Sequence, residues 1–331
     1  MRSRLGDDDV VTNMAATEET LVNIPGKRLR LDALRLPVMA APMFLVSGPD
    51  LVIESCKAGI IGSFPTQNAR TFDELVEWMK VIRAGLAELD RPLWAVSQIV
   101  HRTYDRFEAE LELMTQYQPD IVITALGSPS RVVNEIHGYG GAVFADVMSV
   151  DHARKAADAG ADGLVLVCHG AGGHTGQLSP FAFVDEVREF FGGTLVVGGA
   201  ISTGRAVRAV EILGAELAYV GTRFIAASES LAVERYQEML VRARASDVTE
   251  TRAVTGVLCN WLDESLAEMG FTDDVLGAAG KIDFSDPHGE HKPWKNIFSA
   301  GQGVGQVDRI AHLRDIVDQL VEEYRAASAH A

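Results

Sequence analysis

From residue 37 onward the chain alternates short, β-rich apolar runs with segments of helical pattern. This alternation is typical of βα units arranged around a parallel sheet. Several runs are apolar throughout, as in LVLV at residues 164–167, and strands buried on both faces have this composition. The eight runs span residues 37–41, 59–63, 93–97, 120–124, 141–146, 163–168, 194–198 and 217–221.

Helix start signals lie between the runs. Thr71 followed by Glu74 has the spacing of a capping box, and Ser128, Ser149 and Ser202 are candidate N-caps. Eight strands with eight helices predict an α/β fold, a closed (β/α)8 TIM barrel. A doubly wound open sheet stays as the alternative, because local patterns do not report closure.

The pattern changes after the eighth run, and this sets the expected domains. Residues 1–36 are an N-terminal extension, residues 37–226 and 304–328 form the barrel, and residues 227–303 form a helical appendage covering the barrel mouth. The appendage begins with a helix over roughly 227–245 and an irregular stretch follows it. A last helix is expected from the apolar residues Val307, Ile310, Leu313, Val317 and Leu320.

Charge and cysteine content exclude several classes of partner. The 331 residues carry 30 basic and 46 acidic side chains, a net charge of −16 that repels nucleic acid and anionic membranes. Cys56, Cys168 and Cys259 form no CxxC pair, which favours a reducing, cytoplasmic location. Neither a signal-peptide core nor an apolar stretch of membrane-spanning length is found, so no membrane partner is expected. The sequence is compatible with a homodimer.

In barrels of this type ligands bind where the strands end, so those residues are the candidates for chemistry. Runs seven and eight end in Gly198-Gly199 and Gly221-Thr222, each ahead of a helix start. Backbone N–H groups there could hold a phosphate, although tight βα turns are the alternative explanation. Other runs end in Ala41-Pro42-Met43, Ser97-Gln98, Thr124-Ala125 and Asp146-Val147.

The sixth loop, residues 169–176, places four glycines within seven residues and ends near His174. Such a loop is costly in entropy unless its backbone lies against something, and a ligand is the natural candidate. His174 could then act as a base or a hydrogen-bond donor, or it could simply cap the loop. His169 and His174, with Cys168 or Asp146, could supply metal ligands, but a glycine-rich loop fixes them poorly and their spacing is not that of a zinc site, so no metal is expected. The absence of a lysine at a strand end and of paired carboxylates argues against Schiff-base and glycosidase chemistry.

Four spaced motifs, in this order, resemble the nitronate monooxygenase family, formerly called 2-nitropropane dioxygenases. They are Ala40-Ala41-Pro42-Met43, Ala171-Gly172-Gly173-His174, Gly198-Gly199-Ala200-Ile201 and Gly221-Thr222-Arg223-Phe224, and the match resumes at Ser299-Ala300-Gly301-Gln302-Gly303. Two positions depart from the family pattern. Gly170 replaces an acidic residue, and Ser97-Gln98 replaces an asparagine.

The resemblance implies an FMN-dependent oxidoreductase that oxidises an anionic alkyl nitronate with O₂ to a carbonyl product and nitrite. His174 matches the family's active-site histidine, and the ring would lie against residues 41–43. The phosphate would be held at Gly198, Gly199, Gly221 and Thr222. The full set of expected cofactor contacts is Ala41, Pro42, Met43, Gln98, Asp146, Gly172, Gly173, Gly198, Gly199, Ala200, Gly221, Thr222 and Gln302.

Two other functions share these motifs. The glycine-histidine loop also resembles NAD(P)H-dependent flavin reductases of the quinone reductase and enoyl-acyl-carrier-protein reductase types, and a non-catalytic FMN-binding protein is a third interpretation. No GxGxxG follows a strand, and a charge of −16 gives no general attraction for a dinucleotide. We therefore expect nitronates, rather than NADH or NADPH, to reduce the flavin quickly.

Overall fold

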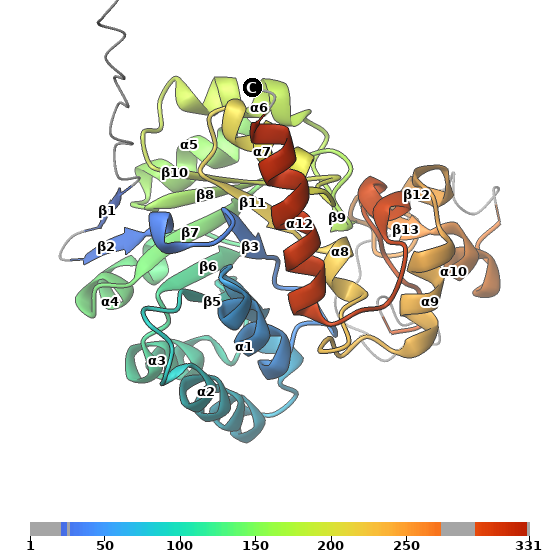
Figure 1. Ribbon diagram of the computed structural model, residues 1–331. Helices are drawn as coiled ribbons and strands as arrows, with labels where there is room; N and C mark the ends of the chain where they lie inside the picture. The colour runs from blue at the N-terminus through green and yellow to red at the C-terminus, as the bar shows by residue number, and fades with distance from the viewer. Residues whose placement is uncertain (1–20, 25–26, 273–294, 330–331) are drawn as a thin grey trace, which may run out of the picture.

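The computed structural model describes residues 21–24, 27–272 and 295–329, and its centre is a closed parallel barrel (Figure 1). Eight strands form one sheet in the order β3-β11-β10-β8-β7-β6-β5-β4. Ala40 donates its N–H to the Ile61 carbonyl at 2.9 Å, and Ile61 donates to the Val38 carbonyl at 3.0 Å. These bonds join the first strand to the start of the second, so the sheet closes and the open-sheet alternative is excluded. The strands are β3 (Val38–Ala40), β4 (Gly62–Pro65), β5 (Trp94–Ile99), β6 (Ile121–Ala125), β7 (Ala142–Val147), β8 (Gly163–Val167), β10 (Thr194–Gly198) and β11 (Leu217–Val220).

Side chains alternate between the inside of the barrel and the helix layer. Val196 of β10 packs inside with Met39 and Phe144, whereas its neighbours Leu195 and Val197 pack among helix residues. The outer helices are α1 (Pro49–Ala58), α2 (Phe72–Leu86), α3 (Phe107–Tyr117), α4 (Val133–Gly138), α5 (Val150–Asp158), α6 (Pro180–Arg188), α7 (Gly204–Ile212) and α12 (Leu313–Ser328), with 3₁₀ turns η2 (Thr66–Asn68) and η3 (Pro129–Arg131). Each of the eight strands predicted from the sequence overlaps one of the eight strands of the barrel.

Three of the four predicted helix starts are confirmed. The Thr71 and Ser149 side chains accept a hydrogen bond from the N–H three residues later, at 3.1 and 3.2 Å, and Ser128 caps η3. The N-cap of α7 is Thr203, so the prediction for Ser202 is wrong by one residue.

The second strand begins later than its predicted start at residue 59. Gly59 is the C-cap of α1, with a left-handed φ of +86° and an N–H bonded back to the Cys56 and Ser55 carbonyls. A glycine at this position ends a helix at little steric cost. The strand therefore cannot begin until the chain has left the cap.

The N-terminal end of the barrel is closed by a hairpin, β1 (Leu21–Ile24) paired antiparallel with β2 (Lys27–Arg30), and by a turn, η1 (Leu31–Ala33). Leu29 and Leu31 are buried among the inward residues of the barrel. The hairpin therefore covers the N-terminal end of the barrel, opposite the C-terminal ends of the strands. The first 20 residues of the expected extension lie outside the described residues.

The appendage follows the last barrel strand and contains strands as well as helices. Its sheet has the order β12-β13-β9, in which β9 (Gly173–His174) comes from the barrel's sixth loop. Figure 1 shows this lobe in orange beside the barrel. Its elements are α8 (Thr222–Ile225), α9 (Glu234–Arg242), η4 (Ala245–Asp247), β12 (Val248–Thr251), β13 (Cys259–Leu262), α10 (Asp263–Glu268) and η5 (Gln302–Gln306). Residues 273–294 lie outside the described part.

Two helices after the last barrel strand, α9 and α12, are shorter than expected. The helix predicted over 227–245 is α9, which begins only at Glu234. The last helix, α12, begins at Leu313, so Val307 and Ile310 precede it. Val307 is buried against α9 residues, whereas Ile310 is 39% exposed. α12 packs along α7 and α1, and it thereby completes the helical ring (Figure 1).

Among the helices of the described residues, none has the length and apolar composition needed to span a bilayer.

Candidate active site

Several inward residues at the C-terminal ends of the strands are small, whereas Ile99, Asp146 and Val167 are larger. Gly198 pairs in register with Tyr219, and Tyr219 pairs with Met39, so all three lie on the inner face. By the same alternation, the inward residues nearest the mouth include Ala41, Ser97, Ala125, Gly198 and Gly221. Bulky side chains fill the barrel below them. The small residues therefore lie at the C-terminal end of the barrel, above a packed core.

Gln98, predicted as a cofactor contact, has its side chain on the other face of β5. It pairs with Thr124, and its amide nitrogen donates to the Phe107 carbonyl at the start of α3, at 3.1 Å. Ser97 is the inward residue, because it pairs with the core residue Ile123. Neighbouring residues of a strand face opposite sides, so the Gln98 side chain points away from the barrel interior and Ser97 is the residue of this pair that faces inward.

The loop after β3 is fixed by hydrogen bonds that the sequence did not reveal. Asn68 donates to the carbonyls of Met43 and Ser47 at 2.9 and 2.7 Å, and its oxygen accepts from the Leu45 N–H at 2.7 Å. Ser47 Oγ accepts from the Met43 N–H at 3.0 Å and donates to the Ala41 carbonyl at 3.3 Å. Residues 41–47, including Pro42, are therefore held in one conformation. Asn68 follows the second strand in η2, and only the fold brings it to this loop.

Met43 reaches the loop that follows the eighth strand. A Cβ atom at Gly221 would lie 3.4 Å from the Met43 sulfur and 3.6 Å from the Ala41 Cβ. Two predicted contact segments, residues 41–43 and 221–222, are thus neighbours. The glycine keeps the surface between them open.

The segment Ala300–Gly303 joins three strand-end loops. The Gly301 N–H donates to Thr222 Oγ1 at 2.9 Å, and the Gln302 N–H donates to the Gly170 carbonyl at 2.9 Å. A Cβ at Gly172 would lie 2.7 Å from the Gly301 nitrogen, and one at Gly303 would lie 2.9 Å from the carbonyl oxygen of Ala200 in the loop after β10. The predicted contacts at Gly172, Ala200, Thr222 and Gln302 are therefore gathered at one place.

This packing changes the explanation of the glycine-rich loop. A Cβ at Gly172 would collide with the Ala300 and Gly301 backbone, and one at Gly176 would lie 2.1 Å from the Val167 carbonyl oxygen. Two of the loop's glycines are thus required by contacts within the chain. A ligand is not needed to explain them.

Of the two predicted phosphate-binding turns, the one after β11 keeps its helix start available. Gly221 precedes α8, whose first N–H groups, at Thr222 and Arg223, have no acceptor within the helix. The first N–H of α7, at Gly204, instead donates to the Glu323 carboxylate at 2.8 Å. Gly199, with a φ of +143°, is the remaining feature of the β10 turn. An anion is better served by the β11 turn than by α7.

Ala200 has a left-handed backbone, with a φ of +56°, and its N–H donates to the Gly170 carbonyl at 3.3 Å. A residue with a Cβ atom adopts this conformation at a cost of about 1–3 kcal/mol, and such strain gathers at functional sites. Its N–H is already used, so it adds little to an anion site.

His174 is held by the appendage. It pairs with Cys259 in the β9–β13 ladder, while Gly173 pairs with Asn260. The Asn260 amide donates to the Ala171 carbonyl at 2.7 Å, and this bond ties the glycine-rich loop to β13. Burial lowers the pKa of His174 below its ordinary value, so its imidazole is neutral at pH 7. His169 turns instead toward Glu250, with 3.8 Å between Nε2 and Oε2.

Asp146 faces the inside of the barrel at the end of β7. It pairs with the core residue Val165, and its Oδ1 atom is buried with no hydrogen-bond partner among the described residues. Burial raises its pKa to about 7. The Tyr219 hydroxyl is also buried without a partner within the described chain, and Asp146 contributes to the raised pKa of this tyrosine.

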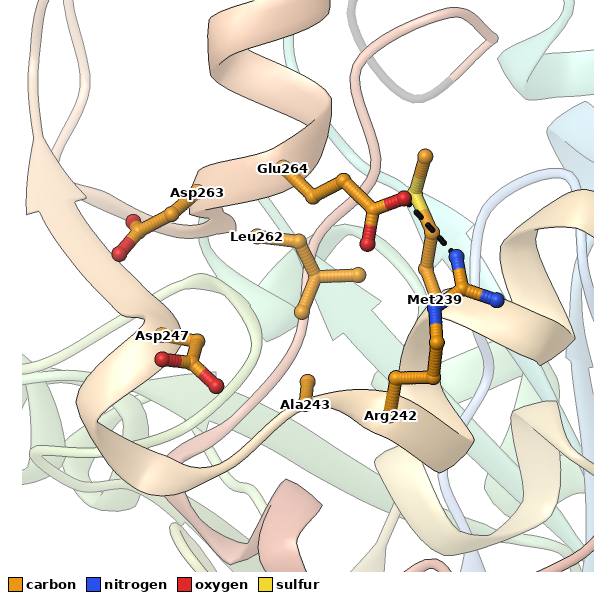
Figure 2. Close-up of a pocket in the computed structure, with 7 residues that line it drawn as sticks. All are labelled: Met239, Arg242, Ala243, Asp247, Leu262, Asp263 and Glu264. Carbon is orange, nitrogen blue, oxygen red and sulfur yellow. Dashed lines mark hydrogen bonds and ion pairs between the residues drawn. The ribbon is translucent and has the colours of Figure 1, made fainter.

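A separate cavity of about 260 Å³ lies within the appendage, between α9, β13 and α10 (Figure 2). Asp247, Asp263 and Glu264 border it, and Arg242 is bonded to Glu264 at 2.8 Å. Figure 2 shows this pair on one side of the cavity and the two aspartates on the other. Its carboxylates make it a poor anion site, and no barrel strand ends there. No metal-binding cluster of histidine, cysteine and carboxylate side chains is found within the described residues.

Comparisons with known proteins find relatives over most of the chain. The family model for nitronate monooxygenase matches residues 88–323. A curated relative from Paraburkholderia phytofirmans, named nitronate monooxygenase, is 28% identical, and the match covers 91% of this chain and 98% of the relative.

Two solved structures share the fold. Nitroalkane oxidase from Streptomyces ansochromogenes has a TM-score of 0.78 and 22% identity, covering 91% of this chain and 99% of that chain. FabK from Thermotoga maritima has a TM-score of 0.74 and 23% identity, covering 91% of this chain and 96% of that chain. At these identities the two structures support the barrel fold and its appendage, and they do not choose between reactions.

Proposed function

We propose, from the premise that this chain belongs to the nitronate monooxygenase family, that it uses FMN and O₂ to oxidise alkyl nitronates. Membership makes it a flavin-dependent oxidoreductase. The balanced reaction converts two nitronate anions and one O₂ into two carbonyl compounds and two nitrite ions. The observation that carries the proposal is the neutral His174, which the β9–β13 ladder holds in the loop beside the strand ends.

The residues at the mouth fit a flavin. The small inward residues leave a surface on which a flat ring can lie, next to the Met43 thioether and Gly221. The unpartnered polar atoms of Asp146 and Tyr219 could meet polar ring atoms. FMN in particular would have its phosphate at the Gly221–Thr222 turn and Gly199. Arg223 gives no cation there, because it contacts Asp308 and Gln319 at 3.4 and 2.9 Å. The N–H groups of that turn would therefore carry the phosphate charge.

When bound, the flavin supplies the electron transfer between substrate and O₂. The chain's own residues would position and stabilise the substrate. His174 can donate a ring N–H to a nitronate oxygen, and as a neutral base it can take a proton from the carbon of a neutral nitroalkane. The glycine-rich loop keeps this imidazole in place through Asn260 and Gly301. Exclusion of water by the packed loops strengthens hydrogen bonds to the anion.

The test is anaerobic reduction of the purified yellow protein. Addition of an alkyl nitronate should bleach the visible flavin spectrum, and admission of air should restore it and release nitrite. NADH and NADPH should bleach it slowly or not at all. Rapid saturating reduction by NADPH would instead place the protein among the NAD(P)H-dependent flavin reductases, and no bleaching by any of them would favour a flavin-binding protein without this activity.

His174 provides the matched test at the level of one residue. Replacing His174 by Ala should lower turnover of nitronates by about 10² or more and leave the flavin bound, because the residue acts on the substrate rather than on the phosphate. Replacing His169, which faces Glu250, by Ala is the control and should change turnover little. Unchanged kinetics for His174→Ala would remove this residue from the mechanism.

A further inference from the structure

Asp146 and Tyr219 form a polar pair inside the barrel. Tyr219 lies next to the proposed phosphate-binding turns. A Cβ at Gly198 would be 3.2 Å from the Tyr219 Cδ1 atom, and Gly221 follows Tyr219 by two residues. Asp146 is the last inward residue of β7, and its Oδ1 atom is fully buried although the residue as a whole is only partly buried. Tyr219 therefore lies one inward position below Gly221, and Asp146 lies at the inward end of β7, next to the proposed ligand surface.

Within the described residues, the Asp146 Oδ1 atom and the Tyr219 hydroxyl have no hydrogen-bond partner. The barrel interior around them consists of apolar residues such as Met39, Phe144 and Val165. A buried polar atom without a partner costs about 1–3 kcal/mol, so two such atoms on adjacent side chains call for an explanation. Neither atom takes part in the hydrogen bonds that hold the strands, helices or loops together. A ligand bound above Asp146 and Tyr219 would supply the missing hydrogen-bond partners.

We propose that Asp146 is a specificity-determining residue of the mouth, which with Tyr219 admits a negatively charged substrate only while its carboxyl group carries a proton. A protonated carboxyl group can donate a hydrogen bond to an anion or to a ring atom. The ionised carboxylate accepts hydrogen bonds only and repels an anion in a region of low dielectric. This inference rests on the proposed function, because it takes the substrate to be an anion.

Asp146 and its titratable neighbours differ in the direction of their pKa shifts. Burial raises the pKa of Asp146 to about 7, whereas it lowers that of His174 and raises that of Tyr219 well above its ordinary value. β8 contributes only Val165 and Val167 to the inner face beside Asp146, and the inner residues of β6 are apolar as well. Between pH 7 and pH 9, Asp146 is therefore the group in this set that loses a proton.

The experiment measures binding of nitrite, an inorganic anion, to the flavin-loaded protein between pH 5.5 and pH 8.5, through the change that it causes in the visible spectrum. In the wild type the Kd should be constant below pH 7 and should then rise toward tenfold per pH unit, because each bound anion requires one proton on Asp146. In Asp146→Asn, which stays neutral, the Kd should vary less than threefold over the range. Tyr219→Phe removes a hydroxyl group without removing the titrating charge, and it should keep the wild-type slope.

The outcomes separate this proposal from the proposed function. An unchanged slope in Asp146→Asn, or a pH-independent or absent nitrite response in the wild type, overturns the role of Asp146. Flavin content and circular dichroism report whether each variant is folded and loaded, and Asp146→Glu, which keeps the carboxyl group, should restore the slope if Asn disturbs loading. A protein that shows the predicted slope but is not reduced by nitronates would refute the proposed substrate and leave this inference standing.

Discussion

At the scale of single residues, Gly221 carries the clearest consequence. A Cβ there would touch the Met43 sulfur and the Ala41 Cβ at 3.4 and 3.6 Å, and a larger side chain would cover the surface between two predicted cofactor contacts. We expect Gly221→Val to purify with little or no flavin, measured as the ratio of absorbance at 450 nm to that at 280 nm. Gly192→Val is the control, because a Cβ at Gly192 meets nothing within 4 Å. A Gly221→Val protein with full flavin content would show that the cofactor does not bind at this turn.

The same scale shows where sequence reasoning ends. Alternation within β5 separates Ser97 from Gln98, and only the register with Ile123 shows which of the two faces inward. Asn68 gave no signal, because its three hydrogen bonds join it to a loop more than 20 residues earlier in the chain. Glycines that contact other parts of the backbone, such as Gly172, look the same in sequence as glycines that contact a ligand.

At the scale of elements, the β9–β13 ladder makes the appendage part of the candidate site. Asn260 supplies its side-chain bond to Ala171, so Asn260→Ala should loosen the loop that carries His174. We expect turnover of nitronates to fall about tenfold, with flavin content unchanged, in steady-state assays. Asn134→Ala on the exposed face of α4 is the control. A loss of flavin equal to the loss of turnover would show that Asn260 supports the cofactor instead.

Sequence patterns predicted the elements of the barrel well and those of the appendage less well. Buried parallel strands read as apolar runs, and each of the eight predicted runs overlaps an observed strand. β9 has only two residues, and its partner β13 lies in a stretch without clear periodicity. Their pairing depends on contacts between distant segments, which periodicity does not encode.

At the scale of the whole molecule, α12, the last helix, packs against α1, the first helix of the barrel. Its buried face packs against α7 and α1, and Leu320 is 1% exposed. Leu320→Ala should lower the free energy of unfolding by about 2–5 kcal/mol, and thermal denaturation followed by circular dichroism should show a lower Tm. Ile212→Ala on α7, which is 66% exposed, should leave the Tm within a degree or so. An unchanged Tm for Leu320→Ala would mean that this face of α12 does not stabilise the barrel.

The position of residues 300–303 has a consequence for how the protein is made. Gly301 and Gln302 bond to Thr222 and Gly170, so the loops after β8 and β11 lack these partners until nearly the whole chain has been synthesised. At translation rates of about 5–20 residues per second, the ribosome needs on the order of ten seconds to pass from Gly170 to Gln302. During that interval the nascent barrel has its strands but not its finished mouth. If the flavin binds where we propose, its capture follows the synthesis of residues 300–303, and a chain that stalls before residue 300 would not retain it.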